Sequence, residues 1–460
     1  IPYTQENLIL KEDEKLPVGF KYIFDEEGEY EVEIETWHSD GIFKNFSYSI
    51  DVRDQGFVFE RIKENTYPTA PIDDESKFFG RKAIVQRIKD RLYDDSDRTT
   101  FLIYGLRRVG KTSLLNHIEN TMKDRFYPIQ CDCQNVFDAN NTGQLIYQLF
   151  VENVVYGLAD DYDIDIDMPS EEDFEKSPLR QLKRFFMIVE KSIGDKSLLL
   201  LVDEFDEVVK KVEDEVYSHE LFDFIRTKMQ HSNKTRFIIA GGEYLLNIMK
   251  NKALKISDTA KPLEVGFLEP DEAREMMVKP LSGKGIQCLP QTLERILMIT
   301  SGHPYFLTAI GNGLVELLNN EKERYVIYPD DVEFVSDKLI DMTQSNMYKH
   351  FWDSLNTNYK KLIVAIIGEQ LESSGDYIDI DRLYDRIKEV RDGGSLSSDL
   401  YKDKVRAIIN ELISGRILSI ENKDRLTVRI SVEQLRRWTR RWKNVDSVLY
   451  EIQGGIESDE

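Results

Sequence analysis

The sequence has 460 residues but only three cysteines, and this scarcity excludes a disulfide framework. Cys131 and Cys133 would lie roughly 7 Å apart on a predicted strand, so we interpret them as small buried residues. A zinc site would need more Cys or His ligands at short spacing than Cys288 and six scattered histidines supply. We therefore expect a fold that depends on hydrophobic cores, without structural zinc.

Long apolar segments and targeting signals are also missing. No window approaches the roughly 18 consecutive apolar residues of a membrane-spanning helix. The N-terminus lacks the basic start and apolar core of a secretion signal. We therefore expect a cytoplasmic protein with no membrane partner. The sequence begins at Ile1 rather than Met, so we expect it to be a processed piece of a longer chain.

Basic residues are outnumbered, with 61 Lys and Arg against 84 Asp and Glu, which gives a formal net charge of −23. Such a surface as a whole opposes nonspecific attraction to nucleic acid or anionic membrane. Hydrophobic residues make up 41% of the chain, which is ample for burial. The length predicts about two to four domains.

The most informative stretch that is present is the loop at residues 105–113, which fits the pattern G-x-x-x-x-G-K-[ST]. The fixed positions are filled by Gly105, Gly110, Lys111 and Thr112. A short apolar run at residues 100–104 precedes the loop, as a buried strand would, and a helical pattern follows it. Strand, glycine turn and helix start bring free N–H groups and the helix dipole to one point, which suits a polyphosphate.

A second motif is the apolar run at residues 198–202, which ends in Asp203 and Glu204. Two carboxylates after a buried strand are expected at the carboxyl edge of the sheet, where ligands of open α/β folds bind. We expect Lys111 to reach the β- and γ-phosphates and Thr112 to hold Mg²⁺. Asp203 would hold Mg²⁺ through water, and Glu204 would orient or deprotonate the attacking water.

The pattern of apolar runs, prolines and charges predicts an α/β fold with six consecutive regions. They are an immunoglobulin-like β-rich segment at 1–64, a linker at 65–74, the nucleotide-binding core at 75–268, a helical lid at 269–345, a winged-helix domain at 346–445 and an acidic tail at 446–460. Further core strands are expected at 127–133, 236–240 and 263–268. The acidic run at 160–175 predicts a solvated loop.

With these motifs placed, the chain resembles the STAND branch of AAA+-like ATPases. In particular, it resembles the prokaryotic archaeal-type ATPases whose loop reads G-x-R-R-x-G-K-T-S-L-L, as residues 105–115 do here. Phe79-Gly80-Arg81 resembles the element that borders the adenine site, and Gly302-His303-Pro304 looks like the G-x-P motif. The resemblance implies nucleotide contacts by Phe79, Gly80, Arg81, Gly105, Arg107, Arg108, Val109, Gly110, Lys111, Thr112, Ser113, His303 and Pro304.

The resemblance also implies a fold and a way of working. Glu204 beside Asp203 resembles the additional-strand P-loop NTPases, in which the parallel sheet has the order 5-1-4-3-2. In this family ADP holds a closed monomer through the lid and the winged helix, and exchange for ATP opens it, often into an oligomer. ATP or ADP, Mg²⁺, slow hydrolysis and an unidentified protein partner or stimulus are therefore expected.

Two departures from the family pattern concern catalysis and recognition. The fourth strand ends in Gly241-Gly242-Glu243, without the polar or basic sensor residue of many relatives, and no repeat array follows the winged helix. Arg226 on the preceding helix is a candidate catalytic finger for a neighbouring subunit's nucleotide, with a solvated helix arginine as the alternative.

Two other functions stay open at this point. A DNA-binding ATPase like the origin recognition family would also carry a C-terminal winged helix, and residues 436–443 include five basic side chains. The net charge of −23 instead favours either pairing of this basic helix with the chain's own surface or plain solvation of its side chains. The third hypothesis is a non-enzymatic scaffold in which the nucleotide is structural.

Overall fold

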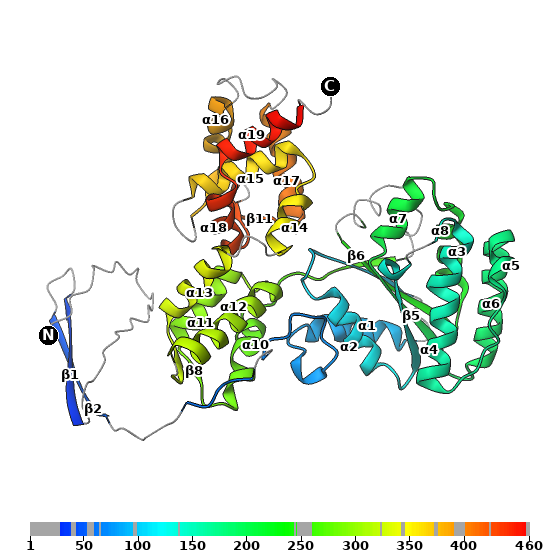
Figure 1. Cartoon of the computed structure of the whole chain (residues 1–460), viewed down its shortest axis with the longest axis horizontal. Helices are drawn as coiled ribbons and strands as arrows, with labels where there is room; N and C mark the ends of the chain where they lie inside the picture. The colour runs from blue at the N-terminus through cyan, green and yellow to red at the C-terminus, as the bar shows by residue number, and fades with distance from the viewer. Residues whose placement is uncertain are drawn as a thin grey trace.

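The computed structural model describes most of the chain, and the statements below concern the described residues. These are 28–37, 43–52, 59–63, 66–94, 99–136, 139–242, 245, 260–322, 324–341, 346–371, 376–390, 401–422 and 425–456. Figure 1 shows an α/β body, a helical layer beside it, a second helical body that carries the C-terminus, and a separate N-terminal hairpin.

The α/β body is built on a five-stranded sheet in which all neighbouring strands are parallel. The strands are β3 (Thr100–Tyr104), β4 (Phe126–Asp132), β5 (Ser197–Asp203), β6 (Thr235–Gly241) and β7 (Ala260–Glu264). Their spatial order is β7-β3-β6-β5-β4, which reads 5-1-4-3-2 in order along the chain. β7 lies further toward the N-terminus than the predicted 263–268, because the carbonyls of Gly266 and Phe267 accept hydrogen bonds from Arg81.

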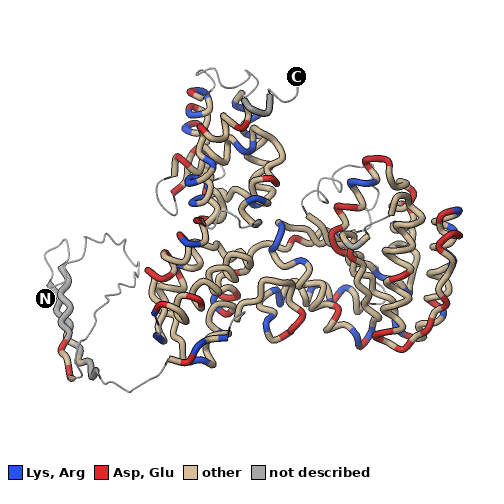
Figure 2. The backbone as a smooth tube through the Cα atoms, in the orientation of Figure 1, with Lys and Arg blue, Asp and Glu red and all other residues tan. Residues whose placement is uncertain are grey.

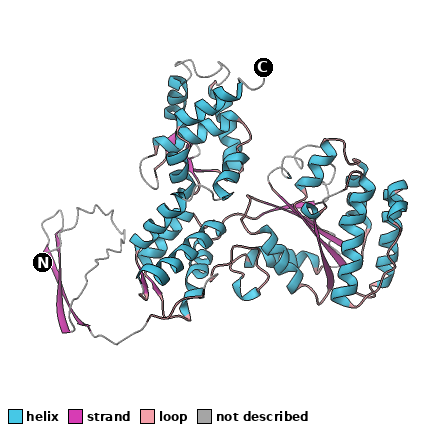
Figure 3. Ribbon diagram, in the orientation of Figure 1, coloured by secondary structure: helices cyan, strands magenta, loops and turns pink. Residues whose placement is uncertain are grey.

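Helices cover both faces of this sheet (Figure 3). The helices are α1 (Lys82–Leu92), α2 (Lys111–Thr121), α3 (Thr142–Ile146), α4 (Asn153–Tyr162), α5 (Glu171–Lys176), α6 (Pro178–Ser192), α7 (Asp206–Glu213) and α8 (Glu220–His231). Successive leucines of β5 alternate between the two cores: Leu198 and Leu200 join the cluster with α6 and α8, whereas Leu199 and Leu201 join the one with α1 and α2. This explains why the strand is a continuous apolar run.

The acidic run at 160–175 is predicted to be a loop, and this prediction is wrong for part of the run. α4 extends through its first residues, and α5 begins at Glu171 with Phe174 buried beneath it. The three acidic residues in the first turn of α5 favour a helix N-terminus there, since the helix dipole is positive at that end. The charges therefore mark a helix start as well as a solvated surface.

The layer beside the core consists of four helices, which we call the lid. They are α10 (Pro270–Ser282), α11 (Pro290–Thr300), α12 (Pro304–Leu317) and α13 (Pro329–Asp341), with the short strands β8 (Gln287–Cys288) and β9 (Val326–Ile327). Residues 66–73 cross this layer, and we call them the strap. Tyr67 is 1% exposed and joins the hydrophobic core of the lid, so the prediction of a simple linker at 65–74 is wrong.

The C-terminal body contains six helices and a small sheet of order β10-β12-β11 among the described residues. The elements are α14 (Asn346–Ser354), α15 (Asn358–Gln370), β10 (Ile378–Asp379), α16 (Ile380–Val390), α17 (Lys402–Ser414), β11 (Leu418–Asn422), β12 (Thr427–Ile430), α18 (Glu433–Trp442) and α19 (Val445–Ile456). The predicted acidic tail at 446–460 is wrong as far as Ile456. Val445 and Val448 are buried in the same core as α15, and their spacing is helical.

The N-terminal region is a hairpin of two antiparallel strands, β1 (Gly28–Trp37) and β2 (Phe43–Val52). In the described part of the chain this hairpin forms a sheet of its own, with no second sheet of a sandwich. Residues 1–27 of the predicted β-rich segment lie outside the described residues.

Two expectations from composition concern membranes and metals. Among the described helices, none has the length and hydropathy needed to span a membrane. The same residues contain no group of three or more His, Cys, Asp or Glu side chains arranged to hold a metal ion. Cys131 and Cys133 are free and buried, which confirms their interpretation as small core residues.

Candidate functional site

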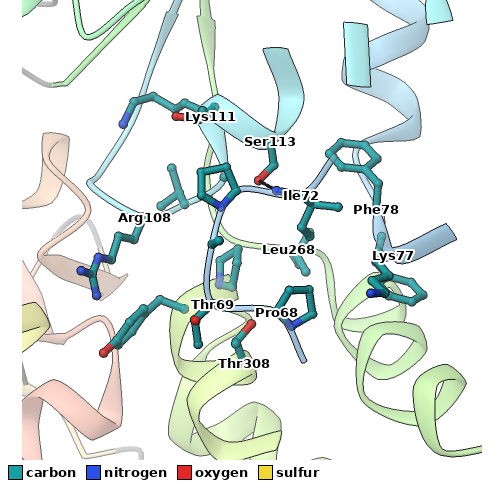
Figure 4. Close-up of a pocket in the computed structure, with 18 of the residues that line it drawn as sticks. Pro68, Thr69, Ile72, Lys77, Phe78, Arg108, Lys111, Ser113, Leu268 and Thr308 are labelled. Carbon is teal, nitrogen blue, oxygen red and sulfur yellow. Dashed lines mark hydrogen bonds between the residues drawn. The ribbon is translucent and has the colours of Figure 1, made fainter. Parts of the chain in front are cut away.

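A cavity of about 540 Å³ lies where the core, the lid and the strap meet (Figure 4). The strap contributes residues 68–72, and the loop before α2 contributes residues 107–113. The lid contributes Met276 of α10 and the first turn of α12, while Glu204 closes the side at the end of β5. The cavity therefore has walls from parts of the chain that are distant in sequence.

Glycine geometry brings the loop close to the edge of the sheet. A Cβ on Gly105 would lie 2.2 Å from the carbonyl oxygen of Val265, so a larger residue does not fit there. Gly110 caps α2 with a φ of 95°, a backbone conformation that residues with a side chain rarely adopt. Gly105 itself lies behind the cavity, whereas Gly110 lines it.

Lys111 is buried at the start of α2, and its Nζ donates to the carbonyls of Gly105 and Leu106 at 3.2 and 3.0 Å. Burial lowers the pKa of its ammonium group, and the nearby carboxylates of Glu204 and Asp203 partly offset that effect. Backbone carbonyls are neutral partners, so the positive charge stays available to an anionic ligand.

Thr112 and Asp203 meet at the bottom of the site. The Thr112 hydroxyl donates to Asp203 Oδ2 at 2.6 Å, and the other carboxylate oxygen accepts from the Glu204 amide at 2.8 Å. A hydroxyl and a carboxylate side by side are oxygen ligands of the type that Mg²⁺ prefers, together with water and phosphate oxygens. The residues present therefore fit a magnesium ion.

Glu204 has a left-handed backbone, with a φ of 50°, directly after the buried strand β5. Burial raises the pKa of its carboxyl group, and the neighbouring carboxylates of Asp203 and Asp206 raise it further, whereas Lys111 and Arg107 oppose the shift. A carboxyl whose pKa is raised is better suited to accept a proton than an ordinary one. The role of Glu204 as a base toward the attacking water stays a prediction.

The two arginines of the loop, Arg107 and Arg108, also line the cavity. Arg108 has a left-handed φ of 61°, and its guanidinium carbon lies 4.8 Å from the centre of the Tyr305 ring. Figure 4 shows the Arg108 side chain directed away from Lys111. Arg108 therefore joins the loop to the first turn of α12 through a cation–π contact.

Arg81 holds the loop and the base of the lid together. Its guanidinium donates to the carbonyls of Val109, Gly266 and Phe267 at 3.1, 2.5 and 3.2 Å, and its backbone amide donates to Glu272 at 2.9 Å. Burial lowers the pKa of this guanidinium to about 10.

The other two residues of the predicted element at 79–81 divide between the cavity and the wall behind it. Phe79 lines the cavity beside Arg81. Gly80 does not, and a Cβ on it would lie 2.7 Å from the carboxyl group of Glu272.

The Gly-His-Pro element is likewise divided. Pro304 lines the cavity, whereas His303 lies behind it, buried between the rings of Phe267 and Phe306. His303 Nδ1 accepts from the Tyr305 amide at 3.2 Å, and burial lowers the pKa of this imidazole to about 3. The histidine is therefore neutral and caps α12, and the structure does not bring it to the cavity.

Arg226 lies on α8, where its guanidinium forms an ion pair with Asp223 at 3.2 Å, and it does not line the cavity. At the end of β6, the carboxylate of Asp206 accepts a hydrogen bond from the Gly242 amide. Burial raises the pKa of the Asp206 carboxyl. Sequence reasoning missed Asp206, although its position three residues after Asp203 would place it near the same sheet edge.

The contacts of the strap are a larger feature that the sequence did not predict. The Tyr67 amide donates to Asn312 of α12, the Asn312 side chain donates back to the Tyr67 carbonyl, and the Tyr67 hydroxyl donates to the Met277 carbonyl. At its other end, the Ile72 amide donates to the Ser113 hydroxyl on α2 at 3.1 Å (Figure 4). The hydroxyl of Ser113 thus holds the strap, in addition to lining the cavity.

Comparison with known proteins agrees with this geometry. Residues 78–310, just over half of the chain, match the model of a family described as an ATPase domain predominantly from Archaea. The fold is similar to a Walker-type ATPase of Pyrococcus abyssi, with a TM-score of 0.58 at 16% identity over 82% of this chain and 99% of that one.

A second similar fold is the ORC2 protein of Aeropyrum pernix in its ADPNP–ADP complexes, with a TM-score of 0.53 at 13% identity over 83% of this chain and 98% of that one. No curated protein matches the sequence. Glycine loop, paired carboxylates, parallel sheet and family model all agree: the chain belongs to the P-loop ATPase family whose members come predominantly from Archaea.

Proposed function

We propose that this chain binds ATP or ADP with Mg²⁺ in the cavity, hydrolyses ATP slowly, and works as a STAND-type switch. The observation that carries the proposal is the composition of the cavity wall, which includes the core loop, the strap and the first turn of α12. A ligand that contacts several bodies binds their closed and open arrangements with different free energies, and this difference is what a switch requires.

The roles of the side chains follow from their positions. Lys111 would contact the β- and γ-phosphates, and Thr112 and Asp203 would hold Mg²⁺, which neutralises charge on the phosphate oxygens when bound. Glu204 would accept a proton from the attacking water. Phe79, Arg81 and Pro304 line the part of the cavity toward the lid and would face the base and ribose.

The described residues at the end of β6 support slow turnover, because they supply no cation to the phosphates. Gly241 and Gly242 offer no polar side chain there, and the adjacent carboxylate of Asp206 has the wrong charge to stabilise phosphate. Glu243, the next residue, lies outside the described residues.

Contacts between the bodies support a closed state. Arg416, in the turn before β11, forms an ion pair with Glu264 at the end of β7, and the Ser301 hydroxyl donates to the Ser431 carbonyl at 2.6 Å. We propose that ADP favours this arrangement and that ATP, together with a protein partner or stimulus, favours opening and assembly into a homo-oligomer. In this proposal residues 75–268 form the ATPase core, 269–345 the lid and 346–445 a winged-helix domain.

The test compares wild type with Lys111→Ala for nucleotide binding by calorimetry and for mass in solution with ADP and with ATP. We expect nucleotide affinity and any nucleotide-dependent change of mass to be lost together in the variant. Retention of both by Lys111→Ala would contradict the proposal.

A second candidate is a DNA-binding ATPase like the origin recognition proteins. It is favoured by the similarity to the ORC2 fold, which extends over 83% of this chain. The net charge of −23 and the internal pairing of the basic residues on α18 oppose it. A gel-shift titration against salt discriminates: specific binding that weakens steeply with salt supports this candidate, and absence of binding at low salt removes it.

A further inference from the structure

Arg107 and Arg108 are both exposed and both line the cavity, although the chain as a whole is strongly acidic. In the part of the chain that the structure describes, neither guanidinium has a hydrogen-bonding or ion-pair partner. An exposed arginine without a carboxylate partner keeps its full capacity to bind an anion, since its fork of donors matches phosphate oxygens.

The two side chains have different surroundings. Arg108 is directed away from Lys111 and lies against Tyr305, where it contacts the lid. Arg107 lines the cavity together with Lys111 and Glu204. Arg107 is therefore the arginine of the loop that stands on the side of the reacting phosphate.

We propose that Arg107 is a catalytic residue that stabilises the transferred phosphoryl group from within the same chain. The inference rests on the proposed ATPase function and names the cation that the end of β6 does not supply. It is an alternative to Arg226, which the sequence predicts as a finger for a neighbouring subunit's nucleotide and which forms an ion pair with Asp223.

The reaction shows where the guanidinium acts. A water oxygen bonds to the γ-phosphorus while the bond from that phosphorus to the β,γ-bridging oxygen breaks, which releases ADP and phosphate. The water gives up a proton to Glu204, and negative charge gathers on the bridging oxygen and the γ-phosphate oxygens. A guanidinium beside these oxygens stabilises the transition state more than bound ATP, so it raises kcat and has a smaller effect on binding.

The experiment measures kcat at saturating ATP and the affinities for ADP and for ADP with aluminium fluoride, in full-length Arg107→Ala and Arg107→Lys. We expect Arg107→Ala to lower kcat by about 100-fold or more, in line with arginines that act on phosphoryl transfer. ADP affinity should fall less than about 10-fold, and affinity for the aluminium fluoride complex should fall much further. Lysine should restore part of kcat, because it keeps the charge and loses the fork.

Two results would overturn the inference. One is a kcat for Arg107→Ala within about 3-fold of wild type; the other is a loss of kcat in Arg226→Ala that depends on protein concentration, which would assign the role to a neighbouring subunit. Lys111→Ala and Glu204→Gln separate this inference from the function itself. If both lose turnover while Arg107→Ala does not, the ATPase function stands and the assignment of Arg107 fails.

Discussion

The loop at 105–113 and helix α18 are both rich in basic residues, but among the described residues only α18 pairs its basic side chains with carboxylates of the chain. On α18, Arg436 is buried and forms two hydrogen bonds with Glu433, at 2.7 and 2.6 Å, and a third with the Leu371 carbonyl. Arg437 pairs with Glu333 and Glu433. The remaining basic residues also have partners within the chain: Arg440 with the Leu371 carbonyl, Arg441 with Asp341 and Lys443 with Glu451.

Among the described residues, the basic side chains of the loop at 105–113 have no such carboxylate partners. Lys111 donates to neutral carbonyls, Arg108 lies on an aromatic ring, and Arg107 has no ion pair within the described residues. Figure 2 shows basic and acidic positions interspersed over the C-terminal body, in keeping with internal pairing there. The comparison teaches that basic residues indicate a ligand when the chain leaves them without its own carboxylates, whatever their density in the sequence.

The largest effect that this comparison predicts is on stability, at Arg436. Arg436→Met should lower the free energy of unfolding by about 3–5 kcal/mol, because the buried Glu433 would lose its two hydrogen bonds with Arg436 and keep the 3.2 Å ion pair with Arg437. Urea denaturation of the full chain measures this. Replacing Glu433 by Gln in the same variant should recover part of the loss. A loss below about 1 kcal/mol would show that this pair is dispensable and weaken the contrast.

Lys111→Ala should have the opposite profile. We expect about a 100-fold loss of ATP affinity, since a charged donor to phosphate is removed, and a smaller loss of stability than for Arg436→Met, because its hydrogen-bond partners are neutral carbonyls. Calorimetric titration and urea denaturation are the two measurements. Lys261→Ala, on an exposed position of β7, is the matched control. A strong destabilisation without loss of binding would contradict the account.

Glu204 is predicted to lower stability at neutral pH. Its folded-state pKa is raised mainly by burial, so the folded protein holds the proton more tightly than the unfolded chain. The contribution of Glu204 to stability is therefore full below its unfolded pKa and is lost as pH rises through the higher folded pKa. Glu204→Gln should thus be more stable than wild type at pH 7 and similar near pH 4. Denaturation at both pH values checks this, and equal differences at the two would refute it.

The smallest predicted effect is at Arg441, whose ion pair with Asp341 is half exposed on both sides. Solvent screening limits such pairs, so Arg441→Ala should cost less than about 1 kcal/mol of unfolding free energy. The same denaturation assay that is used for Arg436→Met provides the measurement. An equal cost at both positions would mean that burial does not distinguish the arginines of α18.

Local patterns predicted the core well. The strand at 100–104 has the predicted bounds, because an apolar run is a property of neighbouring residues. The interpretation that the basic residues of α18 pair with the chain's own surface is confirmed by their ion pairs.

Long-range partners explain the errors. The prolines near Tyr67 predict a linker, but its hydrogen-bond partner Asn312 is 245 residues away in the sequence. His303 stands beside Pro304 in the motif, but the aromatic rings around it remove it from the cavity. Val445 and Val448 have helical spacing in the sequence. The prediction of an acidic tail gave more weight to the acidic residues that follow them.

The central claim is that one nucleotide contacts the phosphate loop, the strap and the lid together. Hydrogen exchange of the full chain, with and without Mg²⁺ and ADP, tests it most directly. We predict that ADP slows exchange at residues 107–113, at 69–72 of the strap and at 305–308 of α12. Protection confined to 107–113, with the strap and α12 unchanged, would contradict it.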